Sequence, residues 1–208
     1  RRSSSAASDV YKRQIQQLFN NADLCVNLIG ILFEKGKNNF NNIHVEFPKM
    51  ISRYASTYKL EKFVHLSALG IENAKDSIYA QSKLKGEEEI LNNFDKAVIV
   101  RPSIVYSVDD NFTTQLMTLL GLLPIFPIYY NGKTKFRPIF CSDLTNSITK
   151  IITDDIKENI IEFAGPEEMS FKEILEKLLS LIEKKRLLLP MPISLARMTA
   201  HILSLIHI

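Results

Sequence analysis

The chain has 208 residues, 46% of them hydrophobic, which is enough for one sizeable core of a globular protein. Its formal charge is only +3, with 26 basic and 23 acidic residues intermixed, so no basic patch argues for nucleic-acid binding. The four histidines lack metal-ligand spacing, and no apolar run reaches the ~18–20 residues that a membrane-spanning helix needs. We therefore expect no metal site and no transmembrane segment. Cys25 and Cys141 lie in apolar runs, which favours two buried thiols over a disulfide.

Both ends of the chain differ in composition from the Asn-, Ile- and Lys-rich body between them. Residues 1–14 resemble translated sequencing-adaptor sequence, and residues 204–208 have the same character. We expect both ends to be non-native and leave them out of the functional reasoning.

Strands and helices alternate in the first half of the chain. Residues 23–29 form a continuous apolar run, which is typical of a buried strand in a parallel sheet. A helix is expected over 44–58, a strand over 62–66, a helix over 79–92, and a strand over 97–101 that Pro102 ends. This alternation predicts an α/β fold with a doubly wound parallel sheet.

The pattern changes after Tyr106. The later segments predict a helix over 111–121, a turn at Asn131-Gly132, a strand over 135–140, a helix over 144–154, a strand over 160–163 and a helix over 170–184. The last helix is expected to begin with a capping box, with Ser170 as N-cap and Glu173 three residues on. Residues 15–106 and 138–165 are assigned to the domain with the large sheet, and residues 107–137 and 166–203 to a small lobe.

The stretch from Tyr79 to Lys83 offers the clearest chemistry. Residues four apart share one face of a helix, so the Lys83 ammonium can lie close to the Tyr79 phenol. A free tyrosine has a pKa near ~10, and a nearby cation lowers it, as a tyrosine acid/base requires. Ser67 closes the apolar run before it, where a strand end in an open α/β sheet meets its ligand. The alternative is a solvated helix face with this spacing by chance.

Four segments together resemble the short-chain dehydrogenase/reductase superfamily, in its extended and atypical branch. They are Asp23–Gly30, Phe63–Gly70, Tyr79–Glu87 and Val98–Tyr106. More narrowly, the chain is similar to the nucleotide-binding accessory subunit of respiratory complex I and to bacterial NAD-dependent epimerase/dehydratase-like relatives. That narrower resemblance uses Val26–Leu32, His44–Glu46, Phe63–Gly70 and Leu187–Pro192, and the whole spans roughly residues 15–203. The chain departs from the family at Ser107, where family members often have glycine, which leaves the course of that loop open.

The resemblance implies a Rossmann-type domain that binds NADP or NAD, with a small C-terminal substrate lobe. The seven glycines include no G-x-G-x-x-G cluster, so we expect the phosphate-binding loop and the first βα units to lie upstream of this fragment. The residues that the resemblance places at the cofactor are Asn27, Gly30, Tyr79, Lys83, Pro102 and Ser103.

Each of these positions also has a structural interpretation. Asn27 and Gly30 could simply form a turn, and Pro102 could simply end a strand. Arg137 is the candidate for holding an anionic substrate group, because guanidinium suits phosphate and carboxylate, with a surface ion pair as the alternative.

Three functions remain open at this point, because a fold alone does not fix a function. The resemblance implies a protein that holds the nucleotide as a structural cofactor and serves complex I or its assembly, in the cytoplasm or peripherally on the inner face of the respiratory membrane. The second is an oxidoreductase or epimerase/dehydratase with Ser67, Tyr79 and Lys83 as catalytic residues. The third is an assembly protein that has kept the fold and lost the ligand.

Overall fold

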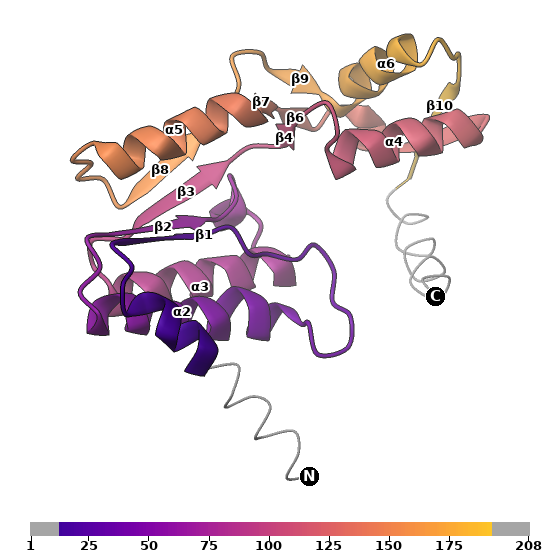
Figure 1. Ribbon diagram of the computed structural model, residues 1–208. Coiled ribbons are helices and arrows are strands. Elements are labelled where there is room, and N and C mark those ends of the chain that lie inside the picture. Colours follow the sequence, from indigo (N-terminus) through magenta and orange to yellow (C-terminus); the bar gives the residue numbers. More distant parts are fainter. Residues whose placement is uncertain (1–12, 193–208) are drawn as a thin grey trace. The chain divides into compact units, whose positions relative to one another are not determined.

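The computed structural model describes residues 13–192, which divide into two compact units (Figure 1). Within that range the first unit contains the residues up to Pro102 together with Leu144–Phe163. The second contains Ser103–Asp143 and the residues from Ala164 onward. The segments expected to be non-native lie outside the described residues, apart from positions 13 and 14.

The first unit is built on a parallel sheet with helices on both faces (Figure 1). In spatial order its four strands are β1 (Leu24–Asn27), β2 (Lys62–Leu66), β3 (Val98–Pro102) and β8 (Ile160–Phe163). Helices α2 (Phe47–Thr57) and α3 (Ile78–Asn93) cover one face, and α5 (Cys141–Thr153) lies on the other. The predicted α/β class is confirmed, and the carboxyl ends of the strands point to one edge of the sheet.

The core of this unit lies between the sheet and helices α2 and α3. Ile51 and Ala55 are one helical turn apart on α2 and are 4% and 0% exposed, so that helix buries one stripe against the sheet. All five residues of β3 are buried, as an inner strand of a parallel sheet requires. Strand β1 is shorter and more exposed than predicted, because in the described residues it is an edge strand paired only with β2.

The helical region before α2 begins earlier than its pattern indicates. Residues Asn41–Glu46 form a π-helical turn, η1, which continues directly into α2. Helix α3 packs closely on this turn at Gly86, where an added Cβ would lie 1.9 Å from the carbonyl oxygen of His44. Glycine at this position therefore allows two backbones to meet.

The second unit is built on short two-stranded sheets. Its strands form three pairs, β5 (Ile125–Tyr129) with β10 (Leu187–Met191), β4 (Val105–Tyr106) with β7 (Ile139–Phe140), and β6 (Lys135–Phe136) with β9 (Met169–Ser170). Helices α4 (Asn111–Leu122) and α6 (Phe171–Leu181) pack with β5 around Leu120, Ile128 and Leu175. The capping box predicted at Ser170 and Glu173 begins α6.

Three expectations from the sequence are wrong, two about strands in this unit and one about the two cysteines. The strand expected over 135–140 is two short strands, because Pro138 cannot donate to a ladder. Strands β5 and β10 were not expected, and each carries a proline. Cys141 is exposed and Cys25 is half-buried, so the thiols are not both buried.

Within residues 13–192 no helix combines the length and apolarity needed to cross a membrane.

Candidate functional site

The loop after β1 is tied to β2 through Asn27. The Asn27 side chain is 3% exposed, and its Nδ2 donates to Nδ1 of His65 at 2.9 Å. Its Oδ1 accepts the backbone N–H of Ile29 at 3.2 Å. Asn27 thus uses both ends of its amide to hold the strand end and the loop together, which fits the turn interpretation. Its role beside a cofactor stays a prediction.

Lys83 lies between the end of β2 and the loop after β1. Its side chain is 5% exposed on α3, and its Nζ donates to the carbonyl oxygen of Leu66 at 3.1 Å. An added Cβ on Gly30 would lie 3.3 Å from that Nζ, so the loop after β1 comes close to the ammonium group. Burial lowers the pKa of Lys83 to about 8, against the opposing charge of Glu87. The ammonium group therefore lies where β1 and β2 end.

Ser67 follows Leu66 directly. Its backbone N–H donates to the carbonyl oxygen of Val100 at 2.7 Å, which fixes the position of the residue. Its hydroxyl is buried, with the residue 6% exposed, and it has no hydrogen-bond partner among the described residues. An unpaired buried hydroxyl costs about 1–3 kcal/mol and needs an explanation. A ligand that bonds Ser67 would supply one.

Tyr79 lies in the first turn of α3, which Ser77 caps by accepting the N–H of Ala80 at 3.3 Å. Its ring meets His44 edge-on at 5.4 Å between centroids and Phe40 at 5.8 Å. Burial raises the pKa of the Tyr79 hydroxyl above its ordinary value. The predicted lowering of this pKa by Lys83 is therefore wrong for this structure.

Two histidines belong to this site and were missed by the sequence reasoning. His44 and His65 are each 2% exposed. Burial and the charge of Lys83 lower the pKa of His44 to about 4 and that of His65 to about 3, so both rings are neutral at physiological pH. Both lie in segments that carry the family resemblance, but no local pattern assigns them a role, because a lone histidine in an apolar segment is an ordinary core residue.

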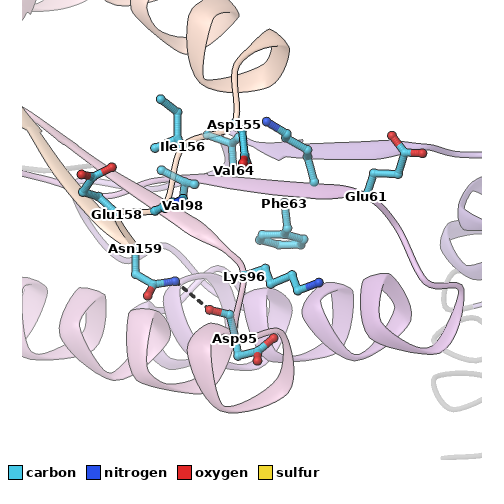
Figure 2. A pocket seen from close by; sticks show the side chains of 12 residues that line it. Glu61, Phe63, Val64, Asp95, Lys96, Val98, Asp155, Ile156, Glu158 and Asn159 are labelled. Atoms are coloured by element: carbon cyan, nitrogen blue, oxygen red, sulfur yellow. Dashed lines mark hydrogen bonds between the residues drawn. The ribbon is translucent and has the colours of Figure 1, made fainter.

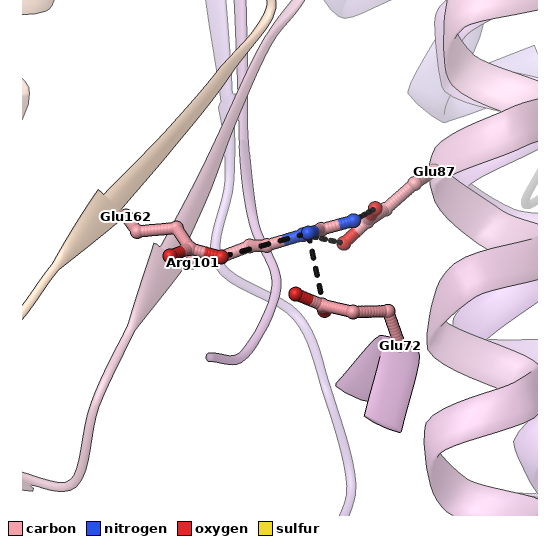
Figure 3. A network of polar contacts seen from close by, with 4 residues as sticks. All are labelled: Glu72, Glu87, Arg101 and Glu162. Atoms are coloured by element: carbon pink, nitrogen blue, oxygen red, sulfur yellow. Dashed lines mark hydrogen bonds and ion pairs between the residues drawn. The ribbon is translucent and has the colours of Figure 1, made fainter. Parts of the chain in front are cut away.

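Arg101 is the centre of a polar network at the end of β3 (Figure 3). Its Nε and Nη2 donate to the two carboxylate oxygens of Glu87 at 3.1 and 2.7 Å. Its Nη1 donates to Glu72 at 3.2 Å and lies 3.7 Å from a carboxylate oxygen of Glu162. The network joins β3 to α3, to β8 and to the short helix η2 (Ile71–Asn73) that follows Ser67. It therefore braces the loop between Ser67 and Tyr79.

The remaining predicted residues are not brought to this cluster by any described contact. Pro102 ends β3, and its carbonyl oxygen accepts the N–H of Leu69 at 2.9 Å. Ser103 begins the second unit. Arg137 is exposed in that unit, and its Nη2 donates to the carbonyl oxygen of Pro166 at 3.1 Å. Among the described residues Arg137 makes no ion pair. Its substrate role stays a prediction.

A cavity of about 340 Å³ lies at the amino ends of the strands, at the other edge of the sheet from Ser67 and Lys83 (Figure 2). Its lining comes from the starts of β2 and β3 and from the segment before β8, and it includes Glu61, Phe63, Asp95, Lys96 and Asn159. Charges of both signs line it, and it is far along the strands from Ser67. Within residues 13–192 no three His, Cys, Asp or Glu side chains lie close enough together to hold a metal ion.

No protein-family model matches the chain. Over 183 residues it is 24% identical to the mouse protein "NADH dehydrogenase [ubiquinone] 1 alpha subcomplex subunit 9, mitochondrial", covering 88% of this chain and 48% of that protein. The chain thus spans about half the length of the curated relatives it matches. This similarity confirms the predicted resemblance to the complex I accessory subunit.

Solved structures confirm the Rossmann-type fold. A dTDP-4-dehydrorhamnose reductase from Bacillus anthracis, in complex with NADP, superposes with a TM-score of 0.72 at 18% identity, over 86% of this chain and 70% of that one. A UDP-glucuronic acid 4-epimerase from Bacillus cereus, in complex with NAD, gives a TM-score of 0.70 at 21% identity, over 85% of this chain and 65% of that one. At these identities the likeness shows the fold alone.

Proposed function

We propose that the chain is part of a protein that binds NADP(H) or NAD(H) as a structural cofactor and associates with respiratory complex I. The observation that carries the proposal is the unpartnered, buried hydroxyl of Ser67. Ser67 directly follows Leu66, whose carbonyl oxygen accepts a hydrogen bond from the Lys83 ammonium at the carboxyl end of β2. In parallel α/β sheets this edge is where nucleotides bind.

The donors at this edge fit the nicotinamide half of a dinucleotide. Ribose hydroxyls and a carboxamide oxygen are hydrogen-bond acceptors, and Ser67, Tyr79 and Lys83 carry O–H and N–H groups that can donate to them. Lys83 uses one of its three N–H bonds on Leu66, which leaves two for a ligand. If the protein catalyses a reaction, the nicotinamide ring of the bound cofactor would be the centre of hydride transfer. The 208 residues contain no glycine-rich phosphate cradle, so we expect dinucleotide affinity to be weak in this chain alone.

The electrostatics favour holding a nucleotide over proton transfer. A tyrosine acid/base needs a pKa near the working pH. Here burial raises the pKa of Tyr79 and lowers that of Lys83, so both changes oppose a phenolate beside an ammonium. The alternative, an NAD(P)-dependent oxidoreductase or epimerase/dehydratase, rests on the presence of Ser67, Tyr79 and Lys83, since a shared fold does not fix a function.

The exchange of Ser67 for alanine tests nucleotide binding. Removing an unpartnered buried hydroxyl should leave the free protein equally stable or up to about 1 kcal/mol more stable. The same change should weaken binding of NADPH or NADH, measured by calorimetry on the full-length protein, by about five- to tenfold. The matched control is Ser56→Ala, an exposed serine at the end of α2 in the same unit. Undiminished nucleotide affinity in Ser67→Ala would remove the observation on which the proposal stands.

The exchange of Tyr79 for phenylalanine separates the structural from the catalytic function. A structural cofactor site loses one hydrogen bond, worth about 1 kcal/mol, and keeps its nucleotide. Association with complex I should then persist, as measured by co-migration of the tagged full-length protein with complex I on native gels. Cofactor oxidation that is coupled to a defined substrate and abolished by Tyr79→Phe would establish the enzyme instead.

A further inference from the structure

His44 connects the loop after β1 to the first turn of α3. It lies in the π-helical turn η1. This geometry is rare in proteins as a whole, but where it occurs it is often at a functional site. Helix α3 approaches its backbone so closely that position 86 must be glycine. The backbone of His44 is therefore fixed against α3, and the two nitrogens of its imidazole face partners on other elements.

The hydrogen bonds of His44 fix its tautomer. A backbone N–H can only donate, so Nε2, which lies 3.1 Å from the N–H of Ile31, must be the unprotonated acceptor. Nδ1 then carries the proton and donates to Oγ of Ser82 at 2.9 Å. That hydroxyl donates in turn to the carbonyl oxygen of Tyr79 at 2.7 Å. A continuous chain of three hydrogen bonds runs from the loop after β1 to Tyr79.

Ring contacts add to this connection. Phe40 stacks on the imidazole, with centroids 5.3 Å apart and planes 20° apart. The Tyr79 ring meets the imidazole edge-on, with the planes 86° apart. An added Cβ on Gly30 would lie 3.7 Å from Nε2 and 3.3 Å from Nζ of Lys83. One side chain thus contacts the tyrosine and borders the glycine that faces the ammonium.

We propose that His44 is a positioning residue of the nucleotide site, which sets the places of Gly30 and Tyr79 relative to Lys83. This inference rests on the proposed function, and it adds a residue that the Ser67, Tyr79 and Lys83 pattern does not contain. His44 does not touch the reacting atoms. It acts through Ile31 on the loop and through Ser82 on the helix.

The two hydrogen bonds can be removed separately. In His44→Gln the side-chain oxygen can reach the place of Nε2 and accept from Ile31, and in His44→Asn the side-chain nitrogen can take the place of Nδ1 and donate to Ser82. His44→Phe keeps a ring between Phe40 and Tyr79 and loses both bonds. The matched control is Tyr58→Phe, which removes one hydrogen bond, from Gln16 at 3.1 Å, elsewhere in the same unit.

The first measurement needs no ligand. In the 208-residue chain, imidazole ¹⁵N shifts should show a neutral ring protonated at Nδ1, and the Ile31 amide should exchange slowly. We expect its exchange to become at least tenfold faster in His44→Phe and His44→Asn, to stay slow in His44→Gln, and to be unchanged in Tyr58→Phe. A ring protonated at Nε2, or an Ile31 amide that His44→Phe leaves unchanged, overturns the proposal.

The second measurement uses nicotinamide mononucleotide, titrated by NMR. Its dissociation constant should rise about tenfold in His44→Phe and rise less in His44→Gln and His44→Asn, because each keeps one bond. If the unsubstituted chain and the full-length protein both fail to bind this probe and NADPH, the proposed function falls, and the Ile31 result alone decides whether His44 positions the loop. If the probe binds equally to His44→Phe, the positioning role falls while the proposed function stands.

Discussion

Replacing Arg101 by methionine tests how far the first unit depends on one buried ion pair. The side chains of Arg101 and Glu87 are 10% and 4% exposed and make two hydrogen bonds to each other. The other two carboxylates, of Glu72 and Glu162, are 43% and 48% exposed. Removal of the guanidinium therefore leaves the buried Glu87 carboxylate without its hydrogen-bonded partner, with only the charge of Lys83 on the same helix to oppose it, and returns the carboxylates of Glu72 and Glu162 to water.

These exposures set the expected magnitudes. Breaking a buried pair by removing one partner costs about 3–5 kcal/mol, because the remaining charge is uncompensated. That is a large part of the roughly 5–15 kcal/mol by which a domain is stable. Glu72→Gln changes a half-exposed pair and should cost less than about 1 kcal/mol. In the double variant Arg101→Met/Glu87→Leu neither partner of the buried ion pair remains, so most of the loss should be recovered.

Urea unfolding followed by circular dichroism measures all three variants. Hydrogen exchange of the β3 amides assigns the effect to the first unit, since the two units need not unfold together. The reasoning is refuted if Arg101→Met is no less stable than Glu72→Gln. It is also refuted if the double variant is as unstable as Arg101→Met, because the loss would then come from packing and not from the unpaired carboxylate.

Two further predictions concern the packing of α3 and the buried histidines. In urea unfolding Gly86→Ala should destabilise the first unit by about 1–3 kcal/mol, because its Cβ would lie 1.9 Å from a backbone oxygen. The control is Gly121→Ala, whose Cβ would meet only the end of a lysine side chain at 3.8 Å. This exchange should be neutral or stabilising by up to about 1 kcal/mol. Equal effects of the two exchanges would contradict this packing. The free energy of unfolding should fall as the pH drops from 6.5 to about 3, because His44 and His65 have folded pKa values of about 4 and about 3 and the unfolded chain binds protons first. Two such groups contribute at most about 2.7 kcal/mol per pH unit. A His65→Gln variant with the same slope as the unsubstituted chain would show that His65 is not one of its causes.

The sequence predicted the elements whose patterns are local. The apolar run of β3, the alternation of strands and helices, and the capping box at Ser170 are all visible within a few residues, and each was found. Strands β5 and β10 were missed because Pro127 and Pro190 argue against a strand. Their pairing is stable only as one ladder between segments about 60 residues apart, which no local pattern reveals.

The candidate site was also predictable only where its pattern is local in the sequence. The spacing of Tyr79 and Lys83 places both on α3, as expected. The direction of the ammonium toward Leu66 depends on where β2 ends against that helix, so the expected effect on Tyr79 could not be checked from spacing. His44 has partners 13 and 38 residues away, and its role arises only when η1, α3 and the loop after β1 meet.

The protonation states at this edge explain why the same three residues can serve binding without catalysis. At pH 7 Lys83, with a pKa of about 8, already carries its proton and cannot accept one from Tyr79, whose own pKa is above its ordinary value of 10.0. Ionising the phenol at pH 7 would cost more than about 4 kcal/mol, since each pKa unit corresponds to about 1.36 kcal/mol. The neutral phenol and the ammonium therefore remain donors, and with Ser67 they present O–H and N–H groups to an acceptor-rich ligand. Catalysis would need a bound ligand to lower the pKa of Tyr79 by several units, whereas nucleotide holding needs no change at all.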